Sequence, residues 1–127
     1  MTSLPITIKE TQEGLLTGKF SAVELVEAYL AKIEKEDKGI NAFITVTDDL
    51  AYQKAKETDR ILKNDGAKAL KEKPLLGITV AHKDMFLTKG VRTTAASNVL
   101  KDYVPDYSAT VVKRMAEAGA IMLGKTN

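Results

Sequence analysis

A lysine followed by an aspartate stands just after an almost continuously apolar run. The run is Leu75–Ala81, and the sequence then reads His82, Lys83, Asp84. Apolar runs of this length, bounded by Pro74 and by charge, are typical of a buried β-strand. Open α/β sheets place functional groups at the carboxyl ends of their strands. Lys83 is therefore a candidate functional residue, although most lysines at strand ends are solvated loop residues.

The two neighbours of Lys83 have simpler interpretations. Side chains alternate along a strand, so His82 should point to the opposite face from Lys83. His82 is the only histidine of the chain, and a lone histidine is more often a structural residue than a catalyst. Asp84 is most simply a turn former or a partner for nearby backbone amides.

A second candidate lies at Gly119–Thr126, which reads G-A-I-M-L-G-K-T. The stretch matches the pattern G-x-x-x-x-G-K-[ST] of phosphate-binding loops, with Lys125 as the pattern's lysine. Such a loop follows a strand and leads into a helix, whose N-terminus holds the phosphates. Here Gly119 ends a helical segment, and the four variable residues form an apolar strand. We therefore interpret the match as a helix end followed by a core strand, without nucleotide binding.

The composition excludes several other kinds of site. The chain has no cysteine and one histidine, which excludes disulfides, cysteine nucleophiles, and thiolate or histidine-rich metal sites. Its 19 basic and 17 acidic residues leave a net charge of +2, too small and scattered for a nucleic-acid-binding surface. The sequence shows neither a signal peptide nor a stretch near the ~18 apolar residues of a membrane span. We expect a cytoplasmic protein.

Helical patterns fill the first half of the chain, residues 1–66. The predicted helices cover about 7–18, 21–39 and 47–66, with an extended stretch at 40–47. Two of these helices begin with capping-box spacing, at Thr7 and at Ser21, and Thr47 or Asp48 should cap the third. The first helix should end at Gly14 or Gly18. The lysine-rich residues 67–74 predict a solvated linker.

The second half, residues 74–127, has the pattern of a βαβ unit. The apolar run at 75–81 predicts a strand covered on both faces. After a long polar connection, apolar residues at helical spacing predict a helix from near Ser108 to Gly119, and A-I-M-L predicts a second, fully buried strand. The two strands should be parallel and joined by a right-handed crossover.

The most specific signal is the order of four motifs along this half. They are G-I-T-V-A-H-K-D from Gly77, T-K-G-V-R-T-T from Thr88, S-A-T-V-V from Ser108, and A-G-A-I-M-L-G-K-T-N at the end. In this order and at these intervals, the motifs resemble the opening of the amidase-signature family. Residues 18–47 also resemble the helical lead-in of that family, so the likeness spans essentially the whole chain.

The resemblance implies an α/β fold: N-terminal helices and then a βαβ unit, the first portion of a larger α/β/α fold around a mixed sheet. Residues 1–127 would be the N-terminal fragment of an amidase domain, with a helical lead-in at 1–66 and the start of the α/β core at 74–127. Within the family, the chain is most similar to the A subunits of amidotransferases that act on glutamyl-tRNA(Gln) or aspartyl-tRNA(Asn).

The resemblance also implies an activity. Family members hydrolyse a carboxamide, here glutamine, with a triad of serine, cis-serine and lysine, and the family's lysine falls on Lys83. The ammonia released would pass to a partner subunit that uses ATP and Mg²⁺ to activate glutamate carried on tRNA(Gln). By this resemblance, the present chain itself binds no cofactor or metal, and it meets tRNA only through the partner subunit.

Both catalytic serines of the family belong to a later Gly/Ser-rich stretch that these residues do not include. The four serines present are Ser3, Ser21, Ser97 and Ser108, and none lies in a G-x-S-x-G or S-x-x-K motif. A lysine also acts as a base only when it is neutral, which normally requires burial. We therefore expect Lys83 to be exposed, protonated and inactive in this chain alone.

Two strands with helices would leave an edge unpaired and apolar faces uncovered, which predicts self-association or dependence on a partner. An alternative hypothesis is that the chain is a non-catalytic protein-interaction module derived from an amidase. Helices such as residues 21–35 would then pack on the partner.

Overall fold

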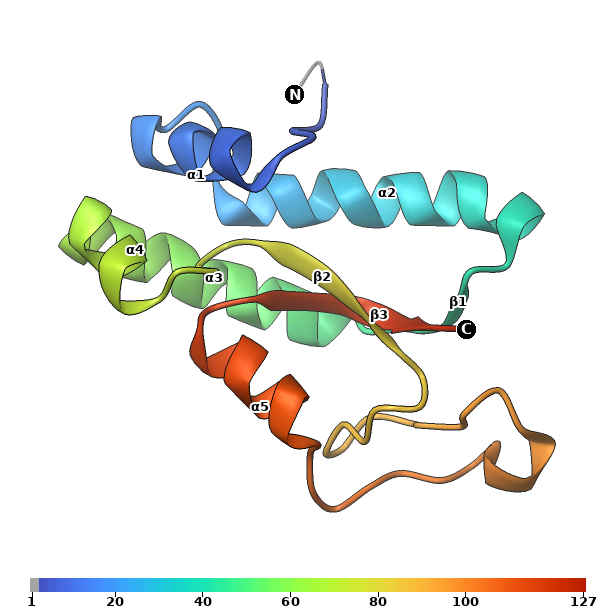
Figure 1. Cartoon of the computed structure of the whole chain (residues 1–127). Helices are drawn as coiled ribbons and strands as arrows, with labels where there is room; N and C mark the ends of the chain where they lie inside the picture. The colour runs from blue at the N-terminus through green and yellow to red at the C-terminus, as the bar shows by residue number, and fades with distance from the viewer. Residues whose placement is uncertain (1–2) are drawn as a thin grey trace.

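The first half of the chain is helical and the second half contributes two of the three strands, as Figure 1 shows. This computed structural model describes residues 3–127. The elements are α1 (Ile8–Thr17), α2 (Ala22–Ile40), β1 (Phe43–Val46), α3 (Asp48–Asp65), α4 (Ala67–Glu72), β2 (Thr79–Lys83), a 3₁₀ turn η1 (Asn98–Leu100), α5 (Thr110–Glu117) and β3 (Ile121–Thr126). The predicted α/β class is confirmed.

Side-chain caps determine where the first two helices begin. Thr7 Oγ1 accepts a hydrogen bond from the backbone N–H of Glu10 at 3.1 Å, and the Glu10 carboxylate accepts one from the N–H of Thr7 at 3.0 Å. The same reciprocal box is present at Ser21, so both predicted boxes are confirmed. Gly18, with φ 70°, ends α1. Gly14 lies inside α1, where a Cβ would stand 2.3 Å from the ring of Phe20.

Two predictions for this half need correction. Residues 67–72, predicted as part of a solvated linker, form the helix α4; most of them are exposed, but Ala69 is buried. Thr47 precedes α3 but makes no side-chain cap. Its hydroxyl instead donates to the carbonyl of Met122 at 3.1 Å. A tertiary hydrogen bond has therefore replaced the local one, and it ties the start of α3 to β3.

The sheet has the order β1-β3-β2, with β3 in the centre. β2 pairs with β3 in parallel, as predicted, while β1 pairs with β3 antiparallel, so the sheet is mixed. The approach of β1 depends on Gly124, because a Cβ at that position would stand 2.4 Å from the carbonyl oxygen of Thr45. A side chain at residue 124 would therefore push β1 away from the central strand.

The prediction of a strand at 75–81, covered on both faces, is wrong in two respects. Residues 74–77 form a turn, in which the N–H of Leu75 donates to Ala118 at 2.8 Å and that of Gly77 to Gly119 at 3.2 Å. These bonds attach the turn to the end of α5, so β2 begins only at Thr79. β2 is also an edge strand within residues 3–127, and the exposed side chains on it include Ala81.

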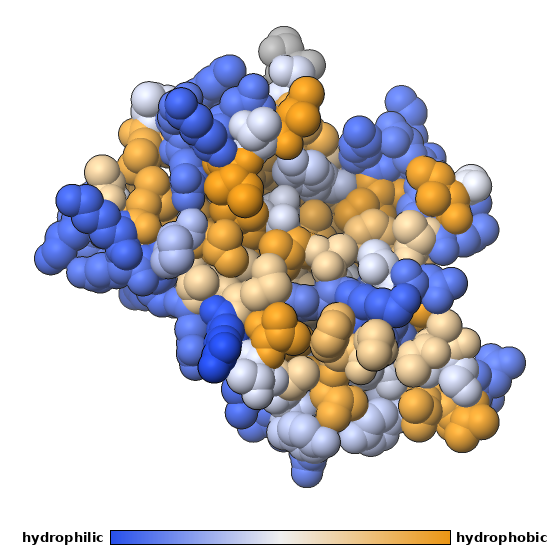
Figure 2. Space-filling model, in the orientation of Figure 1, coloured by the Kyte–Doolittle hydropathy of each residue, from blue (hydrophilic) through white to orange (hydrophobic). Residues whose placement is uncertain are grey.

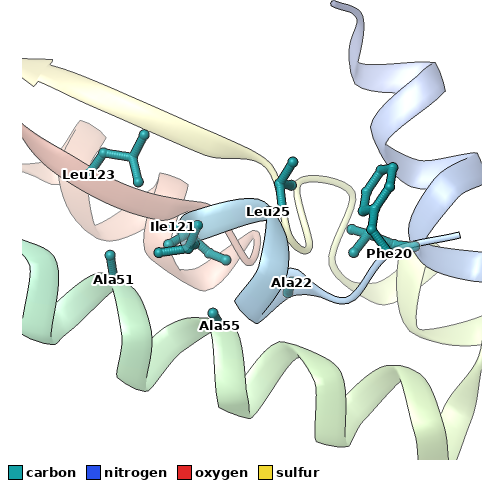
Figure 3. Close-up of a cluster of buried hydrophobic side chains, with 9 residues drawn as sticks. Phe20, Ala22, Leu25, Ala51, Ala55, Ile121 and Leu123 are labelled. Atoms are coloured by element: carbon teal, nitrogen blue, oxygen red, sulfur yellow. The ribbon is translucent and has the colours of Figure 1, made fainter. Parts of the chain in front are cut away.

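The main core lies between α2, α3 and β3, with the junction of α1 and α2 closing one end (Figure 3). Its buried side chains are Leu15, Phe20, Ala22, Leu25, Val26, Ala51, Ala55, Ile121 and Leu123. The small residues Ala51 and Ala55 allow α3 to lie close to β3. The core therefore holds the central strand rigidly from one side.

The connection between β2 and α5 folds back on itself, although it contains only the short turn η1. Backbone bonds join Gly90 to Pro105 at 3.0 Å and Thr93 to Tyr103 at 3.0 Å. Arg92 also donates to the carbonyl of Ile44 in β1 at 2.9 Å. In Figure 2, apolar surface is spread over the lower part of the molecule, where this connection and α5 lie.

Across residues 3–127, every helix falls short of the combination of length and apolar character that crossing a membrane requires.

Glycine 119 offers a test of the packing between the end of α5 and the turn at residues 74–77. It has φ 96°, and a Cβ there would stand 2.7 Å from Cα of Leu76. We expect Gly119→Ala to lower the free energy of unfolding by about 2 kcal/mol or more, from backbone strain and the clash. Gly39→Ala is the matched control: residue 39 lies in α2 with open space around it, and this change should be neutral or raise stability by about 0.5–1 kcal/mol. Urea denaturation would measure both, and equal effects would contradict the packing described.

Candidate active site

Lys83 lies at the carboxyl end of β2, beside Thr126 of β3, its register partner. Its side chain is exposed, as expected. A small pocket of about 90 Å³ opens next to it. The residues that line this pocket are Lys83, Asp84, Met85, Ala95, Ala96, Thr126 and Asn127. The structure therefore places the candidate lysine at the edge of the sheet where the two parallel strands end.

Asp84 forms the buried wall of this pocket, with 1% of its surface exposed. Its backbone N–H donates to Thr126 at 2.7 Å, and its carbonyl accepts from Ala95 at 2.8 Å. Its carboxylate atom Oδ2 accepts from both the N–H and the hydroxyl of Thr94. The predicted role of Asp84 as a partner for backbone amides is thus confirmed.

Lys125 provides the positive charge that faces Asp84. Its side chain has 0% of its surface exposed, and its Nζ lies 3.3 Å from Asp84 Oδ1. The Nζ also donates to the carbonyl of Phe86 at 3.0 Å and to Thr93 Oγ1 at 2.9 Å. The ammonium group therefore makes two hydrogen bonds and one ion pair, and Asp84 Oδ1 accepts no hydrogen bond from the described residues. Burial lowers the pKa of Lys125, and the negative charge of the adjacent Asp84 opposes that shift.

The geometry confirms the interpretation of Gly119–Thr126 as a helix end and a strand. α5 ends at Glu117, and residues 121–126 form β3, whose backbone is paired on both sides. The role of Lys125 in the structure was nevertheless not predicted, because the motif suggested that residue only as a phosphate ligand. A lysine inside an apolar strand was the available signal, since a buried charge requires a partner.

Two alanines on the pocket wall adopt an unusual backbone conformation. Ala95 has φ 49° and Ala96 has φ 55°, in the left-handed region that costs a non-glycine residue about 1–2 kcal/mol. Their N–H groups donate to the Asp84 carbonyl and to Thr94 Oγ1. The site thus contains local strain that these hydrogen bonds hold in place.

His82 lies on the other face of β2 from Lys83, as predicted. It is 8% exposed and pairs in register with Lys125. Burial lowers the pKa of His82, and the charge of Lys125 lowers it further. His82 lines a separate pocket of about 270 Å³ between the sheet, α3 and α5. It therefore does not contribute to the pocket of Lys83.

The serines do not reach Lys83. Ser21 caps α2, and Ser97 Oγ accepts from the N–H of Val99. Ser108 Oγ accepts from the N–H of Lys89 at 2.9 Å. It therefore does not cap α5, whose N-cap is Ala109 without a side-chain hydrogen bond. No serine is among the residues that line the pocket of Lys83.

Comparison with known proteins gives one family and several relatives. The family model described as Amidase matches residues 24–127. The chain is 47% identical to the A subunit of the glutamyl-tRNA(Gln) amidotransferase of Azotobacter vinelandii, over 96% of this chain and 24% of that protein. It is 44% identical to the corresponding protein of Alcanivorax borkumensis, over 95% of this chain and 25% of that protein. The chain thus spans about a quarter of the length of these curated relatives.

Solved structures agree with this result. The peptide amidase of Stenotrophomonas maltophilia superposes with a TM-score of 0.84 at 32% identity, over 94% of this chain and 24% of that chain. An amidase family protein of Bacillus anthracis gives a TM-score of 0.83 at 35% identity, over 98% of this chain and 24% of that chain. The fold described here therefore recurs as part of larger enzymes.

The lowered pKa of His82 predicts a dependence of stability on pH. Above about pH 6.5, the ordinary histidine value, His82 is neutral in the folded and unfolded states and contributes nothing. As the pH falls below that value, the unfolded chain takes up a proton more readily than the folded chain, so stability decreases. We expect the free energy of unfolding to fall between pH 7.5 and 5.5, and much less in His82→Gln. Urea denaturation at both pH values would measure this, and an equal decrease in the variant would contradict it.

Proposed function

This chain belongs to the amidase family, and we propose that it forms part of a glutamine-hydrolysing amidase subunit with Lys83 as a catalytic residue. The observation that carries the proposal is the position of Lys83 in the pocket where β2 and β3 end. The resemblance of its motif to the amidase signature and the similarity to the A subunits of amidotransferases support it.

In the proposed reaction, the amine of Lys83 accepts a proton from a bridging serine, which takes a proton from the nucleophilic serine as that serine attacks the carboxamide carbon of glutamine. The proton on Lys83 then returns through the bridging serine to the amide nitrogen, and ammonia leaves. Water hydrolyses the resulting acyl-serine, which releases glutamate and restores the nucleophile. Both serines come from outside these 127 residues. The described chain contributes the base and one wall of the pocket.

We propose further that the 127 residues alone do not hydrolyse glutamine. The pocket of Lys83 contains no serine, and the exposed position of Lys83 leaves its ammonium group in contact with water. Deprotonation of a lysine base is favoured by removing it from water. Further protein must therefore cover Lys83 and supply the nucleophile.

The ammonia would serve a partner subunit that amidates glutamate carried on tRNA(Gln), and we propose a cytoplasmic location for the reaction. ATP and Mg²⁺ belong to that partner in this proposal. The residues described here do not fit them: residues 3–127 contain no group of three or more side chains suited to a metal ion, and Lys125 is fully buried. No step assigned to this chain therefore runs through ATP or Mg²⁺.

A chimera tests the proposal. The 127 residues would replace the matching stretch of the relative from Azotobacter vinelandii, and ammonia release from glutamine would be measured in the assembled amidotransferase. We expect an active chimera and a decrease of at least about 10³-fold in Lys83→Ala, because the base is removed while the fold is kept. The 127-residue chain alone should release no ammonia.

Lys89→Ala is the matched control, because Lys89 is an exposed lysine of the connection that lies outside the pocket of Lys83. Its activity should stay close to that of the unchanged chimera.

A second candidate function is a non-catalytic interaction module, which the exposed Val99, Val104 and Tyr107 favour. An assembled chimera whose activity survives Lys83→Ala would contradict the catalytic proposal, and stable assembly without activity would favour the module.

A further inference from the structure

The buried pair of Lys125 and Asp84 has no part in the proton transfers proposed above. Among the described residues, Lys125 is the largest that is fully buried. Removing two charges from water costs free energy that their mutual attraction offsets only in part. A buried ion pair is therefore a weak source of stability, and its presence beside a pocket needs another explanation.

The three groups that contact the Lys125 ammonium group, one ion-pair partner and two hydrogen-bond acceptors, come from both ends of one segment. Asp84 begins the segment, Phe86 lies in the turn that follows β2, and Thr93 lies at its far end. Lys125 itself belongs to β3, the central strand, whose backbone is paired on both sides. One ammonium group thus attaches both ends of segment 84–93 to the central strand of the sheet.

The strained backbone follows directly after this segment. Asp84 holds Thr94 through its carboxylate and Ala95 through its carbonyl. Ala95 and Ala96 then line the pocket together with Lys83. Consecutive left-handed alanines persist only where the surrounding contacts hold them. Ala95 donates directly to Asp84, and Ala96 donates to Thr94, which itself donates to Asp84. Lys125 balances the negative charge of Asp84.

We propose that Lys125 is a positioning residue of the site. Through Asp84, Phe86 and Thr93, it holds the backbone of residues 94–96 against Lys83 and so shapes the pocket that receives the substrate amide. The link to the reaction rests on the proposed function, whereas the effect on residues 94–96 does not depend on it. Lys125 of β3 and Lys83 of β2 occupy neighbouring register positions, so their side chains lie on opposite faces of the sheet. Lys125 therefore acts through Asp84, Phe86 and Thr93 and not on the substrate.

Nuclear magnetic resonance of the 127-residue chain tests the structural part. The double variant Lys125→Met/Asp84→Asn removes both charges together, so neither is left buried and unpaired. In the unchanged chain, the ¹³C shifts of Ala95 and Ala96 should report left-handed backbone. In the double variant we expect those shifts to move toward values averaged over several backbone conformations. We also expect the N–H of Ala95 to exchange at least about tenfold faster than it would through global unfolding alone.

Leu25→Ala is the matched control, because Leu25 is fully buried in the main core away from the pocket. It should lower stability while leaving the shifts of Ala95 and Ala96 in place. Thr93→Val, a nearly isosteric change, should move these shifts in the same direction as the double variant by a smaller amount. Thr93→Val therefore still tests the proposal if the double variant does not fold. Shifts that stay unchanged in both site variants, or that move equally in Leu25→Ala, would overturn the proposal.

The chimera tests the link to the reaction. We expect Thr93→Val and the double variant to lower kcat for ammonia release, the double variant by at least about tenfold, with KM changed less than twofold. Leu25→Ala should retain kcat. Altered alanine shifts with full kcat would overturn the positioning role. A chimera that is inactive even without substitutions would count against the proposed function, and the shifts alone would then decide whether Lys125 positions residues 94–96.

Discussion

Pairing of β3 with a strand on each side is the constraint on which the rest of the structure depends. Antiparallel pairing with β1 and parallel pairing with β2 bring together three segments that are far apart in the chain. Parallel strands end at the same edge of a sheet, so Lys83 and Lys125 reach one edge. Because the two lysines occupy neighbouring register positions, their side chains point to opposite faces of the sheet. Lys83 points toward solvent and Lys125 into the protein.

Burial makes these two lysines different in chemistry. The ammonium group of Lys125 makes two hydrogen bonds and one ion pair within the protein and has no exposed surface, so it is suited to holding other groups in place. Lys83 is exposed and borders a pocket, so its amine is accessible from solvent. The strained Ala95 and Ala96 line the pocket of Lys83. Local departures from ordinary backbone geometry are common at functional sites, where the surrounding contacts offset their cost.

The surroundings of Lys83 are open on the side away from Asp84. Ala81 and Lys83 are exposed, and the outer edge of β2 has no strand partner within residues 3–127. A lysine base needs shielding from water, and an unpaired edge readily adds another strand. Both features agree with the proposal that further protein completes the site.

The sequence alone was sufficient for features that depend on neighbouring residues. The capping boxes at Thr7 and Ser21, the parallel pair of strands and the opposite directions of His82 and Lys83 follow from local spacing and strand periodicity. Motif order was sufficient for the family. The burial of Lys125, the strain at Ala95 and the edge position of β2 were decided only by the tertiary structure. Each depends on partners distant in the chain, and no local pattern specifies which charge, carbonyl or strand will lie opposite.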